Sequence, residues 1–278
     1  MVEKREFTIA HSPDADDAFM FYALATGRIE SDLLEFKHVL KDIQTLNQDA
    51  RAGRYDMTAI SYHAYPYVAD RYMLTAAGSS VGDGYGPIVV ASGDLGPGDL
   101  AGRRIAVPGL MTTAYLALRL YEPDFDPVVC DFDRILEAVG GGEVDAGVVI
   151  HEGQLTFGRA GLTGVVDLGE WWKRTQGLPL PLGCNCILRS LPGEVRREAR
   201  RKLSQTIQYS LDHRAEALEY ALQFSRGLET GLADRFVGMY VNEHTTSMVP
   251  EVLESGQRLL DMGFEAGLIP RRVRLEYV

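Results

Sequence analysis

Short apolar runs bounded by turn residues alternate with helical patterns along most of the chain. The run at residues 146–150 lies between a glycine-rich turn and His151-Glu152. An unbroken run of this length is typical of a strand that is covered on both faces of a sheet. Similar runs occur at residues 7–10, 33–40, 56–62, 88–91, 104–109, 128–130, 164–169 and 184–188. Helical segments follow most of them, and this alternation predicts an α/β fold built from βα units.

A glycine-rich segment at residues 93–102 divides these βα units into two sets. It carries Pro97 among its glycines, which is typical of a linker, and a new strand begins at Arg104. Beyond residue 190 the pattern is helical, and apolar residues recur every four positions over 195–211, as in a helix that faces a core. Pro179 and Pro181 predict an edge or crossing segment before the last strand. We therefore predict two lobes, a discontinuous one of residues 1–92 and 190–278 and a second one of residues 93–189.

Charge and composition exclude several classes of protein. The 28 Lys and Arg against 39 Asp and Glu leave a formal net charge of −11. This balance argues against nucleic acid or an anionic membrane as a partner, although a local site can still bind a small anion. The basic cluster at 196–202 is explained by a solvated helix face. Because the chain has no long apolar span, no secretory signal pattern and only three cysteines, we expect a cytoplasmic protein with Cys184 and Cys186 as buried thiols.

Polar side chains end four of the predicted strands. These ends are His11-Ser12, Ser61-Tyr62, Thr112-Thr113 and His151-Glu152. In the first three a hydroxyl stands where a helix begins, and the free N–H groups and positive partial charge there favour an anion or a polyol. Each hydroxyl by itself could be a helix cap. Two ends precede the linker and two follow it, so together they predict a ligand cleft between two lobes that close and exclude water.

His151 is the candidate for acid–base chemistry in that cleft. An imidazole with an unperturbed pKa of about 6.5 can take and return a proton at neutral pH; the alternative is a structural, hydrogen-bonded histidine. Glu152 is a candidate for orienting the ring, although neighbouring residues of a strand face opposite ways. The chain has no G-x-S-x-G motif, and its six histidines show no H-x-H or H-x-x-x-H spacing. We therefore predict neither a serine hydrolase nor a bound metal.

A series of motifs runs in order through nearly the whole chain. They are Ser12-Pro13 with Asp17, residues 19–24, Asp42 with Thr45-Leu46-Asn47, Ser61-Tyr62, residues 86–91, residues 107–109 with 112–115, residues 150–152, residues 166–169 with Trp171-Trp172, residues 177–183 and residues 240–242. In this order they resemble the 1,4-dihydroxy-6-naphthoate synthases of the futalosine route to menaquinone. The resemblance implies a two-lobed fold like that of type II periplasmic binding proteins, each lobe being a mostly parallel sheet flanked by helices.

The same resemblance implies an activity. It implies a lyase that breaks cyclic dehypoxanthine futalosine into dihydroxynaphthoate and a three-carbon sugar fragment, with no cofactor. His151 would be the base that takes a proton from the sugar-derived part of this small anionic substrate. The residues that the matching motifs place in substrate binding or in support of it are Ser12, Asp17, Asp42, Asn47, Ser61, Tyr62, Gly86, Thr112, Thr113 and Asn242. Whether the chain is a monomer or a homodimer stays open.

The first turn departs from the family pattern. That turn is typically Ser-Pro-Cys-Pro-Asn-Asp-Thr-Phe, whereas residues 12–19 here read Ser-Pro-Asp-Ala-Asp-Asp-Ala-Phe. The change places two extra carboxylates, Asp14 and Asp16, beside the predicted cleft and removes a hydroxyl, which would suit an altered substrate. The aspartates also fit the first turn of a helix, with Ser12 or Asp14 as its cap.

Two other activities are compatible with these motifs. One is a non-catalytic protein of the same fold that binds a small carboxylate. The other is the sibling chorismate-derivative dehydratase of the same pathway, which the His151 strand and the threonine pair fit less well.

Overall fold

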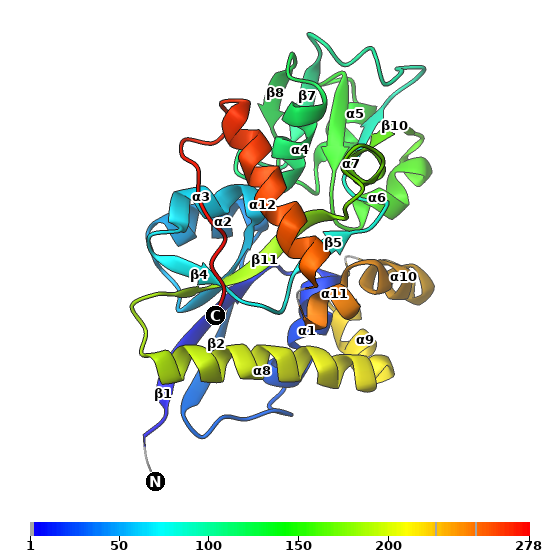
Figure 1. Ribbon diagram of the computed structural model, residues 1–278. Coiled ribbons are helices and arrows are strands. Elements are labelled where there is room, and N and C mark those ends of the chain that lie inside the picture. Colours follow the sequence, from blue (N-terminus) through cyan, green and yellow to red (C-terminus); the bar gives the residue numbers. More distant parts are fainter. Residues whose placement is uncertain (1–2, 226, 248) are drawn as a thin grey trace.

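The protein has two β-sheets, each with helices packed around it, as the computed structural model shows for residues 3–225, 227–247 and 249–278 (Figure 1). The sheet that begins with β1 lies in the lower part of Figure 1, and the sheet that contains β7 and β8 lies in the upper part. We call each sheet with its helices the first and the second lobe. The predicted α/β fold with two lobes is confirmed.

The first sheet is built on parallel βα units from the N-terminal part of the chain. Its strands are β1 (Arg5–His11), β2 (Leu34–Leu40), β3 (Met57–Ser61), β4 (Tyr72–Leu74), β5 (Ser80–Gly82) and β11 (Leu180–Leu188). Their order is β2-β1-β3-β11-β4, and β5 also pairs with β11. Because β1 is parallel to β2 and β3, the carboxyl ends of these three strands lie at one edge of the sheet. The strands β3, β4 and β5 pair with β11 in the antiparallel sense.

The helices of the first lobe come from both ends of the chain. They are α1 (Ala15–Ala25), α2 (Ile43–Arg51), η1 (Tyr62–Ala64), α3 (Tyr65–Val68), α8 (Gly193–Asp212), α9 (Arg214–Leu222), α10 (Thr230–Tyr240), α11 (Glu243–Thr246) and α12 (Pro250–Glu265). The predicted stripe on α8 is confirmed, since Val195, Ala199, Leu203 and Ile207 are all buried. Helix α8 packs against α1, so a C-terminal helix covers an N-terminal one.

The second sheet combines parallel and antiparallel strands in the order β10-β6-β9-β7-β8. Its strands are β6 (Ile88–Ala91), β7 (Arg104–Val107), β8 (Asp126–Val129), β9 (Ala146–Val149) and β10 (Thr163–Asp167). Its helices are α4 (Thr113–Tyr121), α5 (Ile135–Gly140), α6 (Gly153–Thr156), η2 (Phe157–Ala160) and α7 (Leu168–Gln176). The strand β7 is parallel to β8 and β9, whereas β6 is antiparallel to β9 and β10.

The chain passes between the sheets earlier than the predicted boundaries after residues 92 and 189. Strand β6 pairs with β9 and β10, so the first change of sheet falls between β5 and β6. Strand β11 pairs with β3, so the return falls between α7 and β11. The glycine-rich segment at 93–102 joins β6 to β7 within the second sheet instead of joining the lobes. Local composition marks an irregular segment, whereas strand pairing decides to which sheet its neighbours belong.

The prolines before β11 fit the predicted crossing segment. Pro181 pairs with Val81 of β5, and the register of this pairing shifts between Pro181 and Gly183. The pairing of β11 with β3 begins only at Gly183. Pro181 therefore lies where the strand has not yet entered the middle of the sheet, and its missing N–H is tolerated there.

Two helical predictions differ from the structure. From the sequence we expect one helix from His63 to Tyr72, but this segment forms the end of the short pair η1 and α3, followed by the start of the strand β4. Helix α7 was not predicted, because its first residues were assigned to the preceding strand. The side chain of Asp167 accepts hydrogen bonds from the amides of Gly169 and Glu170, and this cap starts the helix directly after β10.

A single apolar core connects the two lobes. It contains Ile60 of β3, Val107 of β7, Trp172 of α7 and Leu259 of α12, all completely buried. Helix α12 contacts β11 and α4, and Figure 1 shows it running along both lobes. The indole N–H of Trp172 also donates to Ser255 at 2.9 Å. The lobes are thus joined by packing as well as by the connecting strands.

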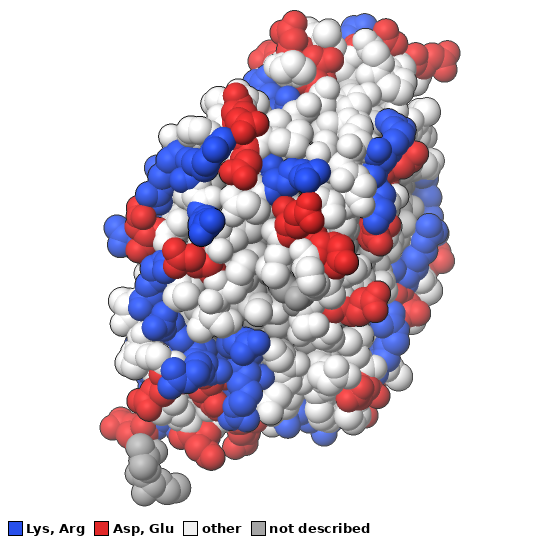
Figure 2. Space-filling model, in the orientation of Figure 1, with Lys and Arg blue, Asp and Glu red and all other residues white. Residues whose placement is uncertain are grey.

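The surface carries charges of both signs (Figure 2). Basic side chains gather in the lower left part of this view, over the region of α8. Within α8, Arg197, Arg200 and Arg201 are exposed, as predicted for a solvated face, and Arg201 pairs with Glu198 at 2.6 Å. Lys202 differs from that prediction because it is buried. Among the described helices, none has the length and apolar character needed to cross a membrane.

Candidate functional site

A cavity of about 100 Å³ lies between the lobes, and the four predicted strand ends all contribute to it. Its polar lining residues are Ser12, Asp14, Asp16, Asp17, Ser61, Ser80, Thr112, Thr113, His151, Gln154, Asn185 and Tyr240. The carboxyl ends of the parallel strands β1 and β3 supply the serines, and the segments after β7 and β9 supply the threonines and the histidine. The prediction that these strand ends meet at one cleft is confirmed.

The two threonine hydroxyls in this lining are held by hydrogen bonds. Thr112 is the N-cap of α4, and its side chain accepts from the amide of Tyr115 at 3.2 Å while donating to the carbonyl of Gly109 at 2.8 Å. Thr113 donates to the carbonyl of Leu182 at 2.7 Å. Thr112 therefore combines the capping alternative with a place in the cavity wall, whereas Thr113 ties that wall to β11. Their contacts order the wall but do not test the substrate-binding role.

Asn47 supports the site from behind. Its Oδ1 accepts from the amide of Ser61 at 2.8 Å, and its Nδ2 donates to the hydroxyl of Ser61 at 3.1 Å and to the carbonyl of Met111 at 3.3 Å. Asn47 is completely buried and does not line the cavity. The predicted supporting position of Asn47 fits these contacts.

The other predicted residues lie outside the cavity lining and have structural contacts. Asp42 and Asn242 are the N-caps of α2 and α11. Tyr62 is completely buried, and its hydroxyl lies 3.3 Å from that of Ser79. A side chain on Gly86 would meet the backbone of Gly169 at 3.0 Å, so glycine is needed there for close packing. For these four residues the sequence motif marked positions that build the wall or the scaffold around the cavity.

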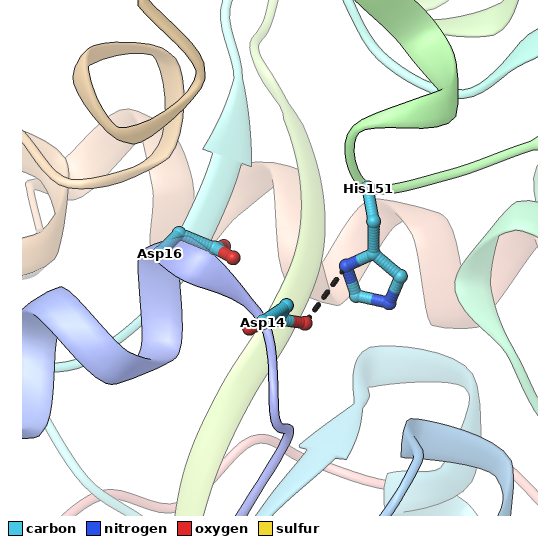
Figure 3. Close-up of side chains that lie close together, drawn as sticks. All are labelled: Asp14, Asp16 and His151. Carbon is cyan, nitrogen blue, oxygen red and sulfur yellow. Dashed lines mark ion pairs between the residues drawn. The ribbon is translucent and has the colours of Figure 1, made fainter. Parts of the chain in front are cut away.

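His151 stands at a turn after β9 with a φ of 51°, which makes it the one non-glycine residue in the described chain with a positive φ. Few residues other than glycine adopt this left-handed conformation, and such strain clusters at functional sites. The turn directs the imidazole of the second lobe toward the start of α1 in the first lobe (Figure 3). Its Nδ1 lies 2.9 Å from Oδ2 of Asp14, and the ring of Phe132 packs edge-on against it.

Asp14, and not the predicted Glu152, is the carboxylate that orients the ring. Its Oδ1 accepts from the amide of Asp17 at 3.2 Å and thereby caps α1, while its Oδ2 contacts the imidazole. Glu152 is also buried and acts on His151 through its charge. The alternation of strand side chains, which already spoke against Glu152, does not apply to this pair because His151 lies in a turn. Asp14 could not be identified from spacing because it comes from the other lobe.

Burial and charge together shift the pKa values of this group. Burial lowers the pKa of His151, but the charge and hydrogen bond of Asp14, together with the charges of Glu152 and Asp17, outweigh burial and leave that pKa above its usual value. Burial raises the pKa of Asp14, but the imidazole and its hydrogen bond bring it well below the usual range. Burial and the charge of Asp14 raise the pKa of Asp16 far above its usual value and that of Asp17 to about 8. The raised pKa values favour neutral carboxyls at Asp16 and Asp17, whereas the lowered pKa of Asp14 favours an ionised carboxylate beside the imidazole.

Asp14, Asp16 and His151 each place one possible donor atom within 4.8 Å of the others. Carboxylates and an imidazole are donor types that many divalent cations accept. In this arrangement, however, the amide of Asp17 and the imidazole already occupy both oxygens of Asp14. Protons can satisfy the same groups without breaking either contact. The prediction of no bound metal was made from the spacing of histidines along the chain, and such spacing does not reveal a group that is assembled from two lobes. The absence of a metal therefore stays a prediction.

Several lining residues were not predicted as site residues from the sequence, among them Asn185, Gln154 and Tyr240. The side chain of Asn185 in β11 is 1% exposed and donates to the carbonyl of Gly78 at 2.9 Å. Its Oδ1 has no hydrogen-bond partner among the described residues. Gln154 and Tyr240 join the lobes by a hydrogen bond of 2.6 Å. Asn185 lies between Cys184 and Cys186, which were correctly predicted to be buried. A polar asparagine in such an apolar strand needs a hydrogen-bond partner, and this could have marked Asn185 as a candidate site residue.

The fold and the cavity between its lobes define a protein of the periplasmic-binding-protein-like class. Among solved structures, the alkanesulfonate-binding protein from Xanthomonas axonopodis pv. citri matches with a TM-score of 0.73 at 16% identity, covering 99% of this chain and 98% of its own. A crystal structure of an Archaeoglobus fulgidus protein matches with a TM-score of 0.92 at 48% identity, over 95% of this chain and 98% of that chain.

The chain belongs to the menaquinone biosynthesis family, whose sequence pattern it matches over residues 7–265. It is 42% identical to the 1,4-dihydroxy-6-naphthoate synthase of Thermus thermophilus over 250 residues, which cover 90% of this chain and 89% of that protein. It is 35% identical to the enzyme of the same name from Streptomyces coelicolor over 269 residues, covering 94% of each chain. The family expected from the sequence motifs is thereby confirmed.

Proposed function

We propose that this protein is a 1,4-dihydroxy-6-naphthoate synthase, a lyase that converts cyclic dehypoxanthine futalosine to 1,4-dihydroxy-6-naphthoate, with His151 as the general base. One observation carries the role of His151. The imidazole lines a cavity shared by serine and threonine hydroxyls of both lobes, and its Nε2 has no partner among the described residues. Because Nδ1 is engaged by Asp14, Nε2 is the nitrogen that can accept a substrate proton.

The hydroxyls and the neutral carboxyls suit a small anionic substrate. Ser12, Ser61, Thr112 and Thr113 would bind the carboxylate and the hydroxyls of the substrate, with Asp17 beside them. An anion enters such a cavity more readily when the carboxyl groups around it are neutral, and the raised pKa values of Asp16 and Asp17 favour this. The proposal requires no cofactor, and it includes a cytoplasmic location.

The cyclic substrate and the purified protein test the proposal directly. Release of the naphthoate is followed by chromatography, and His151→Ala is expected to lose about 10²–10⁴-fold in kcat while substrate binding, measured by calorimetry, is retained. His213→Ala is the matched control, because His213 is an exposed histidine outside the cavity. Tight binding without turnover by the unaltered protein would favour a binding protein instead. Equal activity of His151→Ala and the unaltered protein would remove His151 from the mechanism.

A further inference from the structure

The N-terminus of α1 brings three carboxyl groups to the cavity. Asp14, Asp16 and Asp17 are 2%, 6% and 8% exposed, and all three line the cavity together with His151. Figure 3 shows Asp14 between the imidazole and Asp16, with both carboxyls at the start of the same helix. A helix needs one capping carboxylate, and Asp14 supplies it. Capping therefore leaves Asp16 without an explanation.

We propose that Asp16, Asp14 and His151 form an acid–base relay across the cleft, in which Asp14 positions the imidazole and Asp16 is the acid that protonates the substrate. This proposal rests on the proposed function and adds two residues to it. It concerns two positions at which the chain departs from the family's typical first turn.

Asp14 is the positioning residue because both of its oxygens are committed. One oxygen accepts the amide of Asp17 and fixes the carboxylate to the helix, and the other contacts Nδ1 of His151 at 2.9 Å. An ionised carboxylate accepts hydrogen bonds and donates none, so Nδ1 must carry the proton. The second nitrogen, Nε2, then keeps its lone pair and is aimed at the substrate.

Asp16 has the position and the surroundings of an acid. Its Oδ1 is buried and lacks a hydrogen-bond partner among the described residues, and the side chain lines the cavity. Among the titratable groups near it, Asp14, Asp17 and Glu152 each favour retention of a proton by Asp16, and His151 and Tyr240 also lie close to it. A hydrogen bond between the carboxyls of Asp16 and Asp14 is consistent with a proton on Asp16. A neutral carboxyl of this kind can donate a hydrogen bond inside an apolar site at neutral pH.

An observation outside the acidic turn indicates that a ligand group belongs here. The Oδ1 of Asn185, on the strand β11, is buried without a partner and faces no other described donor. The side chain belongs to the wall of the same cavity. A buried acceptor is costly when it is left unpaired, so a hydroxyl of the substrate is expected to donate to it. The cavity thus offers an acceptor, an acid and a base to a polyhydroxylated ligand.

The relay balances the protons of a carbon–carbon cleavage. Nε2 of His151 takes the proton of a substrate hydroxyl, whose oxygen becomes the carbonyl of the departing fragment as the adjacent carbon–carbon bond breaks. The electron pair of that bond passes into the conjugated ring system, where the oxygen that gains the charge takes the proton of Asp16. The substrate loses one proton and gains one. The enzyme is left with an imidazolium and an ionised Asp16, and transfer of one proton between them restores the starting state.

The first test of the relay replaces Asp14. Asp14→Asn keeps a helix cap but offers an amide donor to Nδ1, so we expect kcat to fall about 10²–10⁴-fold, as for other misplaced histidine tautomers. The charge of Asp14 raises the pKa of His151, whereas burial lowers it. In Asp14→Asn only the effect of burial is left of these two, so the pKa of His151 falls and the acidic limb of the kcat/KM profile moves to lower pH. The nitrogen-15 NMR signals of His151 are expected to change tautomer. Asp167→Asn is the control, since Asp167 caps α7 and does not line the cavity.

The second test replaces Asp16. Asp16→Asn removes the acidic proton and keeps the size of the side chain, so we expect kcat to fall by at least about 10²-fold while substrate binding is retained. The alkaline limb of the pH profile should disappear in this variant. Asp16→Glu, which restores a carboxyl group, should recover part of the activity. Thermal melting confirms that each variant is folded. Activity of Asp16→Asn or of Asp14→Asn within threefold of the unaltered protein, or an unchanged NMR tautomer, would overturn the relay.

Two further outcomes distinguish the relay from its rivals. Stoichiometric divalent metal in the purified protein, lost in Asp16→Asn, would overturn the relay in favour of a metal site. If the unaltered protein binds the cyclic substrate and releases no naphthoate, the proposed function fails and the relay fails with it. If the unaltered protein is active and both variants match it, only the relay fails.

Discussion

Tyr240 of the first lobe donates a hydrogen bond of 2.6 Å to the side chain of Gln154 in the second lobe. Both residues are buried and line the cavity that contains His151. The pair formed by Asp14 and His151 is a second polar contact between the same two lobes. The cavity of about 100 Å³ is smaller than the usual ligand pocket of about 300–1,000 Å³, so we infer that these contacts hold a closed form and expect the lobes to part when a substrate enters.

Removal of the Tyr240 hydroxyl should therefore favour the open form. Tyr240→Phe loses one hydrogen bond between the lobes, a loss of about 0.5–1.5 kcal/mol, which corresponds to an increase in KM of about two- to tenfold. We expect kcat to change little, because the hydroxyl contacts Gln154 and not the imidazole. Steady-state kinetics measure both constants, and Tyr220→Phe, outside the cavity, is the control. An unchanged KM would mean that this contact does not hold the closed form.

Asn47 should be important for stability as well as for the cavity wall. Asn47→Ala leaves the buried amide of Ser61 without an acceptor, and an unsatisfied buried group costs about 1–3 kcal/mol. We expect a lower midpoint of urea unfolding with an unchanged m-value. Gln48→Ala changes an exposed residue of the same helix and should leave the midpoint within about 0.5 kcal/mol. Equal effects of the two substitutions would contradict the role given to Asn47.

Buried histidines should make the protein sensitive to acid. Burial and the neighbouring His38 lower the pKa of His11 to about 3, and burial lowers the pKa of His38 and of His63 to about 4. In the unfolded chain these groups take up protons near pH 6.5. Their stabilising contribution is therefore complete above about pH 6.5 and is lost as the pH falls toward 4.

Thermal melting as a function of pH checks this sign. The melting temperature is expected to fall between pH 7 and pH 4.5, and the fall should be shallower in His38→Gln, which keeps a polar side chain beside His11. His213→Gln, at an exposed position, should follow the unaltered protein. A steeper fall in His38→Gln would show that the two rings do not stay neutral in the folded protein.

Asp16 should have the opposite effect on stability. Burial and the charges of Asp14 and Asp17 raise its pKa in the folded protein, so folding takes up a proton above about pH 4 and stability falls as the pH rises. Asp16→Asn removes this dependence. We expect the variant to melt at a higher temperature than the unaltered protein at pH 7–8, with the difference vanishing near pH 4. A constant difference at all pH values would show that Asp16 carries no proton in the folded protein.

The contact of α7 with the loop before β6 depends on the absence of a side chain at Gly169. A Cβ at this position would lie 1.9 Å from the carbonyl oxygen of Tyr85, which is backbone and cannot turn aside. Gly169→Ala is therefore expected to destabilise the protein by about 1–3 kcal/mol or more, as overpacking does. Urea unfolding measures the change. Gly98→Ala, where a Cβ would meet nothing within 4 Å, should have little effect, and similar effects of both would contradict the steric explanation.

Local features of the fold could be predicted from the chain because their causes lie within a few residues. The apolar runs correspond to strands such as β1, β6 and β9, and the caps at Asp14, Asp42 and Thr112 hold amides only three positions away. Helix α7 was missed because its cap, Asp167, ends the preceding strand. The assignment of β6 and β11 to their sheets was missed because hydrogen bonds between distant strands decide it.

For the site, the sequence by itself determined that hydroxyls and an imidazole lie at the ends of strands. Because parallel strands bring their carboxyl ends to a common edge of the sheet, the sequence also indicated that these groups lie near one another. Only the tertiary structure decided which groups touch. It placed Asp14 of the first lobe against His151 of the second, put Asn185 in the cavity wall and assigned Asp42 and Tyr62 to the scaffold. The physical reason is that contacts between side chains of different lobes depend on distances in space, and so does the burial that shifts the pKa values of these side chains. Spacing along the chain does not give these distances.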